Sequence, residues 1–243
     1  MNRYKYMFKK LYDQTLTSRL YKYENKMIKK TPKIINNKKF NYINEFNILK
    51  KIDNTYKNYD DYPNIIKINE TYEDTSYFYS VMDFYNKGDL HYNMKKKRLS
   101  ICDYKTVINK MIDPIYSIHN IDIVHMDIKL ENYLLDNKTD NYILIDFHLS
   151  MNHTSNYYDL EKISNVTGTE PFIAPEIYDG YYCKASDMYS LGCILYLIYT
   201  DMIYKGDLTL LNKLPYELEM LIIDLLNNNY KLRPSVYDLK YTF

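Results

Sequence analysis

Three polar side chains near the middle of the chain could together transfer a phosphoryl group. Asp127 is followed five residues later by Asn132, and Asp146 comes nineteen residues after Asp127, at the end of the apolar run 142–145. Such a transfer needs one carboxylate to accept the proton of the attacking hydroxyl. It also needs a second carboxylate and an amide oxygen to hold the Mg²⁺ ions that bridge the phosphates. Asp127 fits the first role, and Asp146 and Asn132 fit the second.

These residues belong to a longer series of short motifs. In chain order the motifs are HMDIKLEN at 125–132, DFH at 146–148, GT at 168–169, APE at 174–176, SDMYSLG at 186–192 and RP at 233–234. Their types, order and spacing resemble those of the eukaryotic protein kinase family, and the resemblance covers nearly the whole chain. It implies ATP as the phosphate donor, Mg²⁺ or alternatively Mn²⁺ as the metal, and protein substrates. It also implies that Arg233 pairs with Glu176.

Two residues near Asp127 indicate which hydroxyl accepts the phosphate. Lys129 lies two residues after Asp127, as in the Ser/Thr kinases that the chain resembles, and it could neutralise the γ-phosphate during transfer. Thr169 resembles the threonine with which the family contacts the catalytic Asp and Lys. The resemblance therefore implies Ser and Thr acceptors. Without it, Lys129 would be interpreted as a solvated surface lysine.

The phosphates of the nucleotide need a cation from the first third of the chain. Lys29, in the sequence MIK at 27–29, resembles the strand lysine that holds the α- and β-phosphates, and Glu45 resembles its helix partner. Lys30 is the alternative, because it is adjacent. Met27 lies on the same face of the predicted strand as Lys29, where it would narrow the nucleotide pocket.

The resemblance also assigns residues to the adenosine part of ATP. The run SVMDFY at 80–85 is similar to the family's strand that passes into the hinge between two lobes. Met82 would be the gatekeeper residue, and the backbone of Asp83 and Tyr85 would bond to the adenine. Asp89 would contact the ribose, and Leu134 would form the floor below the adenine.

The glycine-rich phosphate loop of the family is missing, since no glycine precedes Gly88. The matching segment, YDQTLTSRL at 12–20, carries side chains where glycines would let backbone N–H groups approach the phosphates. Asp13 adds like-charge repulsion, although a hydroxyl of Thr15, Thr17 or Ser18 could replace part of the lost contact. We expect weak nucleotide affinity.

Two further substitutions lie beside the catalytic residues. His148 replaces the glycine of the family's DFG motif. We interpret it as a tolerated backbone substitution and not as a catalyst, with consequences for metal affinity. Met126 replaces the arginine that pairs with a phosphorylated residue in the family. We therefore expect no activation by phosphorylation at Thr154, Ser155 or Thr167.

The elements that must position these residues follow from the hydrophobic pattern. A hairpin is predicted at 20–30 with its turn at Glu24-Asn25, further strands at 65–69 and 77–83, and a helix at 38–52. The remainder is mostly helical, with helices at 103–120, 185–200 and 215–227, short strands at 133–135 and 142–145, and an irregular stretch at 149–171. We predict an α+β, two-lobed kinase-like fold. It is a single domain over 1–243, with a strand-rich N-lobe at 1–84 and a helical C-lobe at 85–243.

Composition narrows the partners and the compartment. The chain has 32 basic and 31 acidic residues, so its charge gives no reason to expect nucleic acid or a membrane surface as a partner. The longest apolar run, 191–199, is too short to span a bilayer, and the N-terminus lacks the apolar region of a signal peptide. Three scattered cysteines predict reduced thiols and a cytoplasmic protein. The trimmed sequence is similar in style to kinases of large DNA viruses, for which the compartment would be the host cytoplasm.

Two functions from different classes are compatible with these residues. The first is an active Ser/Thr protein kinase, because every charged catalytic position of the family is filled. The second is a pseudokinase that acts as a binding or regulatory module, because the glycine loop is lost and His148 and Met126 depart from the family pattern. A small-molecule kinase on a related fold fits less well, since the GT and APE motifs are features of kinases with protein substrates.

Overall fold

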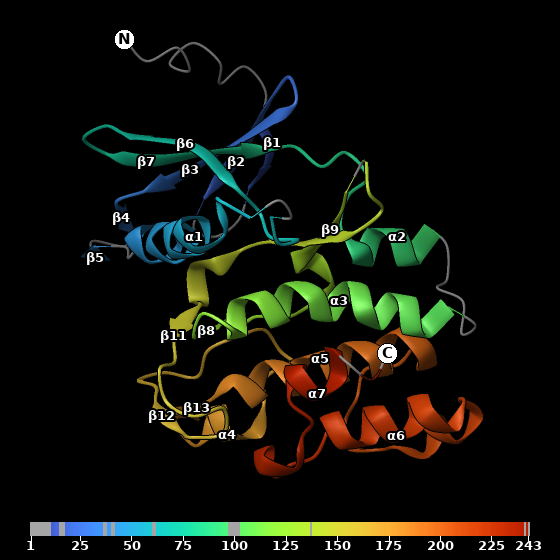
Figure 1. The fold of residues 1–243 in the computed structure, drawn as a ribbon. Coiled ribbons are helices and arrows are strands. Elements are labelled where there is room, and N and C mark those ends of the chain that lie inside the picture. Colours follow the sequence, from blue (N-terminus) through green and yellow to red (C-terminus); the bar gives the residue numbers. More distant parts are fainter. Residues whose placement is uncertain are drawn as a thin grey trace.

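The strands of the first third form one antiparallel sheet (Figure 1). The computed structural model describes residues 11–14, 18–35, 38–39, 42–59, 62–96, 103–136, 138–240 and 242. The five strands lie in the order β1 (Leu11–Gln14), β2 (Arg19–Tyr23), β3 (Lys26–Pro32), β7 (Tyr77–Asp83) and β6 (Ile68–Glu73). The hairpin predicted at 20–30 is therefore confirmed. The strand predicted at 65–69 is wrong at its start, since the ladder begins only at residue 68.

Alternation along β3 separates its two faces. Ile28 is fully buried with Tyr79 and Val81 in a small cluster on one face, whereas its neighbours Met27 and Lys29 point to the other. The turn before β3 holds Glu24 at φ +53, a left-handed conformation that closes a tight hairpin. The face that carries Lys29 is the one turned toward the helix described next.

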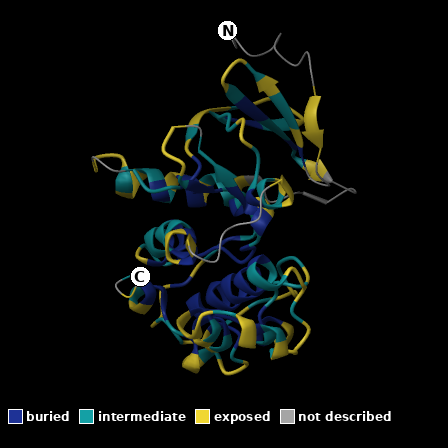
Figure 2. Cartoon of the chain, turned by 90° about the vertical axis from the view of Figure 1, so that its right-hand side faces the viewer, coloured by how far each residue is buried: buried dark blue, intermediate teal, exposed yellow. Residues whose placement is uncertain are grey.

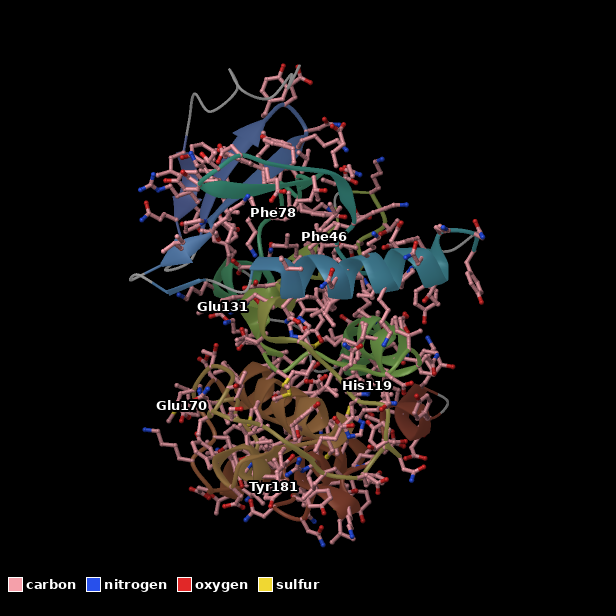
Figure 3. The ribbon with its side chains drawn as sticks, turned by 90° about the vertical axis from the view of Figure 1, so that its left-hand side faces the viewer. Phe46, Phe78, His119, Glu131, Glu170 and Tyr181 are labelled. Atoms are coloured by element: carbon pink, nitrogen blue, oxygen red, sulfur yellow. The ribbon has the colours of Figure 1, made fainter. Side chains whose placement is uncertain are left out.

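Helix α1 (Tyr42–Tyr56) lies between the sheet and the helices below it (Figure 1). Its apolar face buries Ile48, Leu49 and Ile52 in the main core. The rings of Phe46 in α1 and Phe78 in β7 meet edge to face at 5.7 Å, so they hold the helix against the sheet (Figure 3). The prediction of a helix from residue 38 is wrong for its first residues. Lys38–Lys39 form β5, which pairs with β4 (Ile34–Ile35).

The second half of the chain is built around two long helices. Helix α3 (Tyr104–His119) matches the helix predicted at 103–120, and α5 (Lys184–Thr200) is buried along almost its whole length. Buried residues concentrate in these lower helices (Figure 2). The remaining helices of this half are α2 (Leu90–Lys96), α4 (Pro175–Tyr178), α6 (Tyr216–Leu225) and α7 (Val236–Lys240). Within the described ranges, no helix combines the length and apolar character needed to cross a bilayer.

Short strands and 3₁₀ turns connect the helices and border the loops that contain the HMDIKLEN and DFH motifs. The strands are β8 (Ile123–Val124), β9 (Tyr133–Leu135), β10 (Tyr142–Leu144), β11 (Met151–Asn152), β12 (Glu161–Lys162) and β13 (Tyr181–Tyr182). They pair as β9 with β10, β8 with β11 and β12 with β13. Single 3₁₀ turns lie at η2 (Leu130–Asn132), η3 (Phe147–Leu149), η4 (Thr209–Lys213) and η5 (Tyr230–Leu232). The chain thus has the predicted α+β architecture, with a sheet-based lobe above a helical one.

Gly192 sets the approach of α5 to α6. A Cβ built at this position would lie 2.8 Å from the Cβ of Leu225. In a free helix, Gly→Ala is stabilising by about 1 kcal/mol. Here the packing reverses the sign, and we expect Gly192→Ala to lower the free energy of unfolding by about 1–3 kcal/mol in urea titrations. Asp224→Ala, at an exposed position of α6, is the control. An unchanged unfolding midpoint for Gly192→Ala would contradict the tight contact.

Candidate active site

The hairpin of β9 and β10 brings the two predicted metal ligands together. Leu144 pairs with Tyr133 in this hairpin, and the next residue, Ile145, donates its backbone N–H to the carbonyl of Asn132 at 2.9 Å. Asn132 and Asp146 therefore leave the two strands at the same end, although fourteen positions separate them in the chain. The two residues that were predicted to share a metal therefore lie at the same end of the hairpin, and their role as ligands stays a prediction.

Asp127 lies at the centre of a hydrogen-bonded group. Its Oδ1 accepts from Thr169 Oγ1 at 2.6 Å, and its Oδ2 accepts from Lys129 Nζ at 2.6 Å. Lys129 Nζ also donates to Thr169 Oγ1 at 2.8 Å, so the three side chains close a triangle. Asn132 Nδ2 donates to the backbone carbonyl of Asp127 at 2.7 Å. Lys129 is therefore turned into the site, and the interpretation as a solvated surface lysine is wrong.

Thr169 reaches Asp127 because Gly168 precedes it. Gly168 has φ +118, and a Cβ there would lie 3.0 Å from the backbone oxygen of Met126. A side chain at this position would be both strained and crowded. The glycine of the GT motif thus allows the segment from the DFH motif to the APE motif (residues 146–176, the activation segment) to lie against the HMDIKLEN loop (residues 125–132, the catalytic loop).

A buried carboxylate holds the catalytic loop from below. Asp187, in α5, accepts the backbone N–H of His125 at 2.8 Å and that of Met126 at 2.9 Å. It also accepts from His119 Nε2 at 3.0 Å. Met126 has φ +70, an unfavourable angle for a long side chain, and such angles persist where the surroundings fix them. Asp187 is the group that fixes it.

His125 packs inside the protein as a neutral side chain. Burial lowers its pKa, because a desolvated imidazole resists protonation. Its Nε2 donates to the carbonyl of Ile145 at 3.0 Å, and its Nδ1 accepts the N–H of Asp127 at 3.3 Å. Its ring meets Phe147 edge to face at 4.8 Å. His125 thereby ties the catalytic loop to the Asp146 segment.

The choice between Lys29 and Lys30 is decided by their partners. Lys29 Nζ lies 2.6 Å from Glu45 Oε2 and 3.5 Å from Asp146 Oδ1. Lys30 points to the opposite face, where its Nζ lies 3.9 Å from the centre of the Tyr77 ring. Burial alone would lower the pKa of Lys29, but the two carboxylates outweigh it and raise that pKa. The predicted pair of Lys29 with Glu45 is confirmed, and Lys29 stays charged.

His148 is in contact with Asp146. Its Nδ1 lies 2.8 Å from Asp146 Oδ1. Asp146, with φ +68 and ψ +66, takes the left-handed conformation, while His148 lies inside the 3₁₀ turn η3. Burial raises the pKa of Asp146, but Lys29 and His148 lower it overall. The interpretation of His148 as a substitution of backbone alone is thus incomplete, because its ring reaches the predicted metal ligand.

The hinge residues take the positions that the strand pattern implies. Met82 in β7 pairs with Met27 in β3, and Asp83 pairs with Lys26. Lys26 Nζ binds the Asp83 carboxylate at 2.5 Å. Phe84 donates its backbone N–H to the backbone carbonyl of Asn25 at 3.0 Å. The backbone of the half-buried residues Asp83 and Tyr85 stays the predicted contact to adenine.

Asp89 and Leu134 lie next to each other in an isolated antiparallel bridge. This brings the predicted ribose contact against the predicted adenine floor. Asp89 Oδ1 also accepts the N–H of Tyr92 at 2.7 Å. A carboxylate that accepts from the first turn is a helix cap, so Asp89 also stabilises the start of α2. This role was missed by the sequence analysis.

Of the segment 12–20, which takes the place of the glycine loop, the structure describes residues 12–14 and 18–20. Tyr12, Asp13 and Ser18 belong to described residues, whereas Thr15 and Thr17 lie outside them. Asp13 is exposed, and its carboxylate accepts the N–H of Gln14 at 2.7 Å. Weak nucleotide affinity stays a prediction, supported by an exposed carboxylate at the place where the family has a glycine loop.

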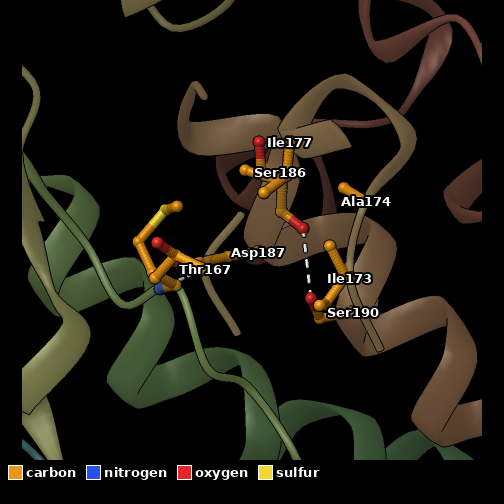
Figure 4. Close-up of a pocket in the computed structure, with 8 residues that line it drawn as sticks. Thr167, Ile173, Ala174, Ile177, Ser186, Asp187 and Ser190 are labelled. Carbon is orange, nitrogen blue, oxygen red and sulfur yellow. Dashed lines mark hydrogen bonds between the residues drawn. The ribbon is translucent and has the colours of Figure 1, made fainter. Parts of the chain in front are cut away.

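A small pocket lies under the activation segment (Figure 4). Its lining residues are Met126, Thr167, Ile173, Ala174, Ile177, Ser186, Asp187 and Ser190. None of these carries a positive charge, and the one carboxylate, Asp187, already accepts hydrogen bonds from the catalytic loop. A phosphate on Thr167 would therefore meet no counter-charge from this pocket. The predicted independence from loop phosphorylation is consistent with this lining.

The end of the activation segment is anchored in the core. Arg233 donates two hydrogen bonds to the Glu176 carboxylate, from Nη1 at 2.7 Å and from Nη2 at 2.8 Å. Ser186 Oγ donates to the same carboxylate at 2.7 Å. The pairing of Arg233 with Glu176 is confirmed, and both side chains are nearly inaccessible to solvent.

One residue outside the motifs positions the Asp146 segment. Asn44, in α1, donates from Nδ2 to the carbonyls of His148 at 3.2 Å and Ser150 at 3.0 Å. It precedes Glu45 directly, so one turn of α1 supplies both the partner of Lys29 and this support. Nothing in the local sequence distinguishes Asn44 from the other asparagines of the chain.

Comparison with known proteins identifies the family. The family model described as "Protein kinase domain" matches residues 12–241. The chain is 30% identical to calcium-dependent protein kinase 5 of Plasmodium berghei over 236 residues, which are 86% of this chain and 40% of that protein. It is 36% identical to calcium-dependent protein kinase 4 of Plasmodium falciparum over 142 residues, or 57% of this chain and 26% of that protein. The chain thus spans less than half the length of these curated relatives. On the match over residues 12–241, the chain belongs to the protein kinase domain family.

Proposed function

We propose that the chain is a Ser/Thr protein kinase that transfers the γ-phosphoryl group of ATP to protein hydroxyls. The observation that carries this proposal is the closed triangle of Asp127, Lys129 and Thr169. It holds a carboxylate beside a lysine, with hydrogen bonds that fix the orientation of both. Such an arrangement can take a proton and stabilise a transferred phosphoryl group without rearrangement.

In the proposed transfer, one bond to the γ-phosphorus forms and one breaks. The Asp127 carboxylate takes the proton of a Ser or Thr hydroxyl, whose oxygen forms a bond to the γ-phosphorus. The bond from that phosphorus to the bridging oxygen breaks, and ADP leaves. Lys129 neutralises charge on the transferring group, and Lys29, held by Glu45, binds the α- and β-phosphates.

The residues fit a divalent metal. Asp146 Oδ1 contacts Lys29 and His148, but Oδ2 has no hydrogen-bond partner within the described part of the chain. Asn132 uses its Nδ2 toward Asp127, so its amide oxygen is the atom left for an ion. These oxygens suit Mg²⁺, which would offset the charge of the phosphates. Mg²⁺ with ATP is the proposed pair, and Mn²⁺ is the alternative.

Transfer of labelled phosphate from ATP to a generic basic protein tests the proposal. Acid hydrolysis of the labelled product should release phosphoserine and phosphothreonine. Recovery of phosphotyrosine alone would overturn the choice of acceptor. No transfer with either metal would favour a pseudokinase, and a thermal-shift titration with ATP and Mg²⁺ would then show whether nucleotide binds at all.

Adjacent lysines provide a matched test of the phosphate contact. We expect Lys29→Ala to lower kcat/KM for ATP by about 100-fold or more, because it removes a preorganised charge from the phosphates. Lys30→Ala should leave kcat/KM unchanged, since Lys30 faces Tyr77 on the other side of the sheet. Steady-state kinetics of both variants measure the difference. Equal losses in the two variants would contradict the assignment.

A further inference from the structure

The hydroxyl of Tyr157, in the activation segment, lies in the interior of the helical lobe. Tyr157 belongs to the turn between β11 and β12, and burial of its hydroxyl raises the pKa of the side chain. Its ring centre lies 5.8 Å from that of Tyr237 in α7 and 5.6 Å from that of His119. The proposed phosphate transfer gives this buried hydroxyl no role.

The turn that carries Tyr157 is closed by its own hydrogen bonds. Asn156 donates to Asp159 Oδ2 from its backbone N–H at 3.1 Å and from Nδ2 at 2.8 Å. The residue after Tyr157, Tyr158, donates from its hydroxyl to the carbonyl of Arg233 at 2.7 Å. One turn therefore directs two neighbouring tyrosines into the helical lobe, where their hydroxyls meet different partners.

The hydrogen bonds of the Tyr157 hydroxyl have one direction. Its oxygen accepts the backbone N–H of Val236 at 3.0 Å and lies 3.4 Å from His119 Nδ1. The other ring nitrogen, His119 Nε2, lies 3.0 Å from the Asp187 carboxylate, so Nε2 carries the proton and donates. Burial lowers the pKa of His119, so the ring is neutral and Nδ1 accepts. The Tyr157 O–H therefore donates to Nδ1, at the long end of the hydrogen-bond range.

These contacts connect the activation segment to the catalytic loop. His119 is fully buried at the end of α3 (Figure 3). Its partner Asp187 accepts the backbone N–H groups of His125 and Met126. Met126 has the left-handed φ of +70 and directly precedes Asp127. A change in the orientation of the His119 ring would thus be transmitted to the peptide beside Asp127.

We propose that Tyr157 is a positioning residue, whose hydroxyl orients the His119 ring and, through Asp187, holds the backbone beside Asp127 in place for phosphate transfer. The activation segment is then linked to the catalytic loop at Tyr157 as well as at Thr169, which bonds to Asp127 directly. Both links are made by neutral hydroxyl groups, so neither needs a phosphate group. This proposal rests on the proposed function only for its kinetic test.

Tyr157→Phe removes the hydroxyl and keeps the ring. We expect kcat for phosphate transfer to fall about 3- to 10-fold, the factor that corresponds to loss of one hydrogen bond. KM for ATP should stay unchanged, because the contacts lead to the acceptor side of the site. Tyr158→Phe is the matched control, since it removes the neighbouring hydroxyl with its bond to Arg233, and it should retain the wild-type kcat. Wild-type kcat in Tyr157→Phe, or an equal loss in both variants, would overturn the proposal.

Amide hydrogen exchange measures the hold on the catalytic loop without relying on activity. The N–H groups of His125 and Met126 should exchange faster in Tyr157→Phe than in the wild type, and at the wild-type rate in Tyr158→Phe. Unchanged exchange in Tyr157→Phe would overturn the proposal. An inactive wild type would overturn the proposed function instead, and the exchange rates would still report whether Tyr157 holds the loop.

The ring nitrogens of His119 report the hydrogen bond itself. In ¹⁵N-labelled wild-type protein, NMR should place the ring proton on Nε2. Tyr157→Phe should move the Nδ1 resonance toward that of a nitrogen with a free lone pair, and Tyr158→Phe should not. His119→Gln keeps a donor for Asp187 but has no acceptor in place of Nδ1, so in this background Tyr157→Phe should lower kcat no further. A proton on Nδ1 in the wild type, or a further loss in the double variant, would contradict the role of Tyr157.

Discussion

Asp127→Asn will lower kcat for phosphate transfer by at least about 100-fold, because general-base catalysis contributes roughly 10²–10⁴-fold. The amide oxygen can still accept from Lys129 Nζ, and the amide NH₂ that replaces the other oxygen can donate to Thr169 Oγ1; both partners hold the carboxylate at 2.6 Å in the wild type. The geometry should therefore survive while the proton acceptor is lost. Steady-state kinetics with a protein acceptor measure the effect, and KM for ATP should change little, since we assign Asp127 to the acceptor side.

Asp224→Asn is the control for this prediction. It makes the same chemical change at an exposed position of α6, so it should transfer phosphate at the wild-type rate. Wild-type kcat in Asp127→Asn would rule out Asp127 as the base. A large loss in both variants would point to a loss of fold.

Arg233→Ala will lower the free energy of unfolding by about 3–5 kcal/mol, the usual cost of removing one partner of a buried ion pair. Arg233 is 1% exposed and Glu176 is 5% exposed. Without the guanidinium, the Glu176 carboxylate would be left buried with Ser186 Oγ as its remaining side-chain donor. The carbonyls of Ala185 and Asn227 would also lose their donor. Denaturant unfolding followed by circular dichroism measures the loss.

A double variant separates the pair from its parts. Arg233→Met with Glu176→Leu removes both charges, so its cost should be well below the sum of the two single changes. Lys105→Ala, which breaks the exposed pair with Glu217, should leave the unfolding midpoint unchanged. A loss below about 1 kcal/mol in Arg233→Ala would contradict the importance of this anchor.

The hydrophobic pattern predicted most helices and strands, because the apolar residues of these elements recur at the spacing of the face that is buried. Helix α3 differs from the predicted 103–120 by one residue at each end, and β7 occupies the predicted 77–83. The errors lie where pairing decides instead. Lys38–Lys39 continue a predicted helix but pair with β4 in the structure. Hydrogen bonds to a distant strand leave no mark on the local hydrophobic period.

The residues of the site likewise fall into those that the sequence predicts and those that only distant contacts reveal. Asp127, Lys129, Thr169, Asn132 and Asp146 were predicted because motif spacing reports them. Asn44 was missed because its two acceptors, the carbonyls of His148 and Ser150, lie about a hundred positions away in sequence. The helix-capping role of Asp89 was missed because ribose contact had been assigned to it.

The sequence by itself determined the family, the fold class and the identity of the charged groups, since these depend on residue types in a fixed order. The tertiary structure alone decided between Lys29 and Lys30, because the pleat of β3 turns only Lys29 toward Glu45. It alone showed that Asp187 supports the strained angle of Met126. It also showed that the His148 ring lies within hydrogen-bond distance of Asp146, because a turn directs the ring to that carboxylate. Each of these depends on distances between segments that are remote in the chain, and only folding sets those distances.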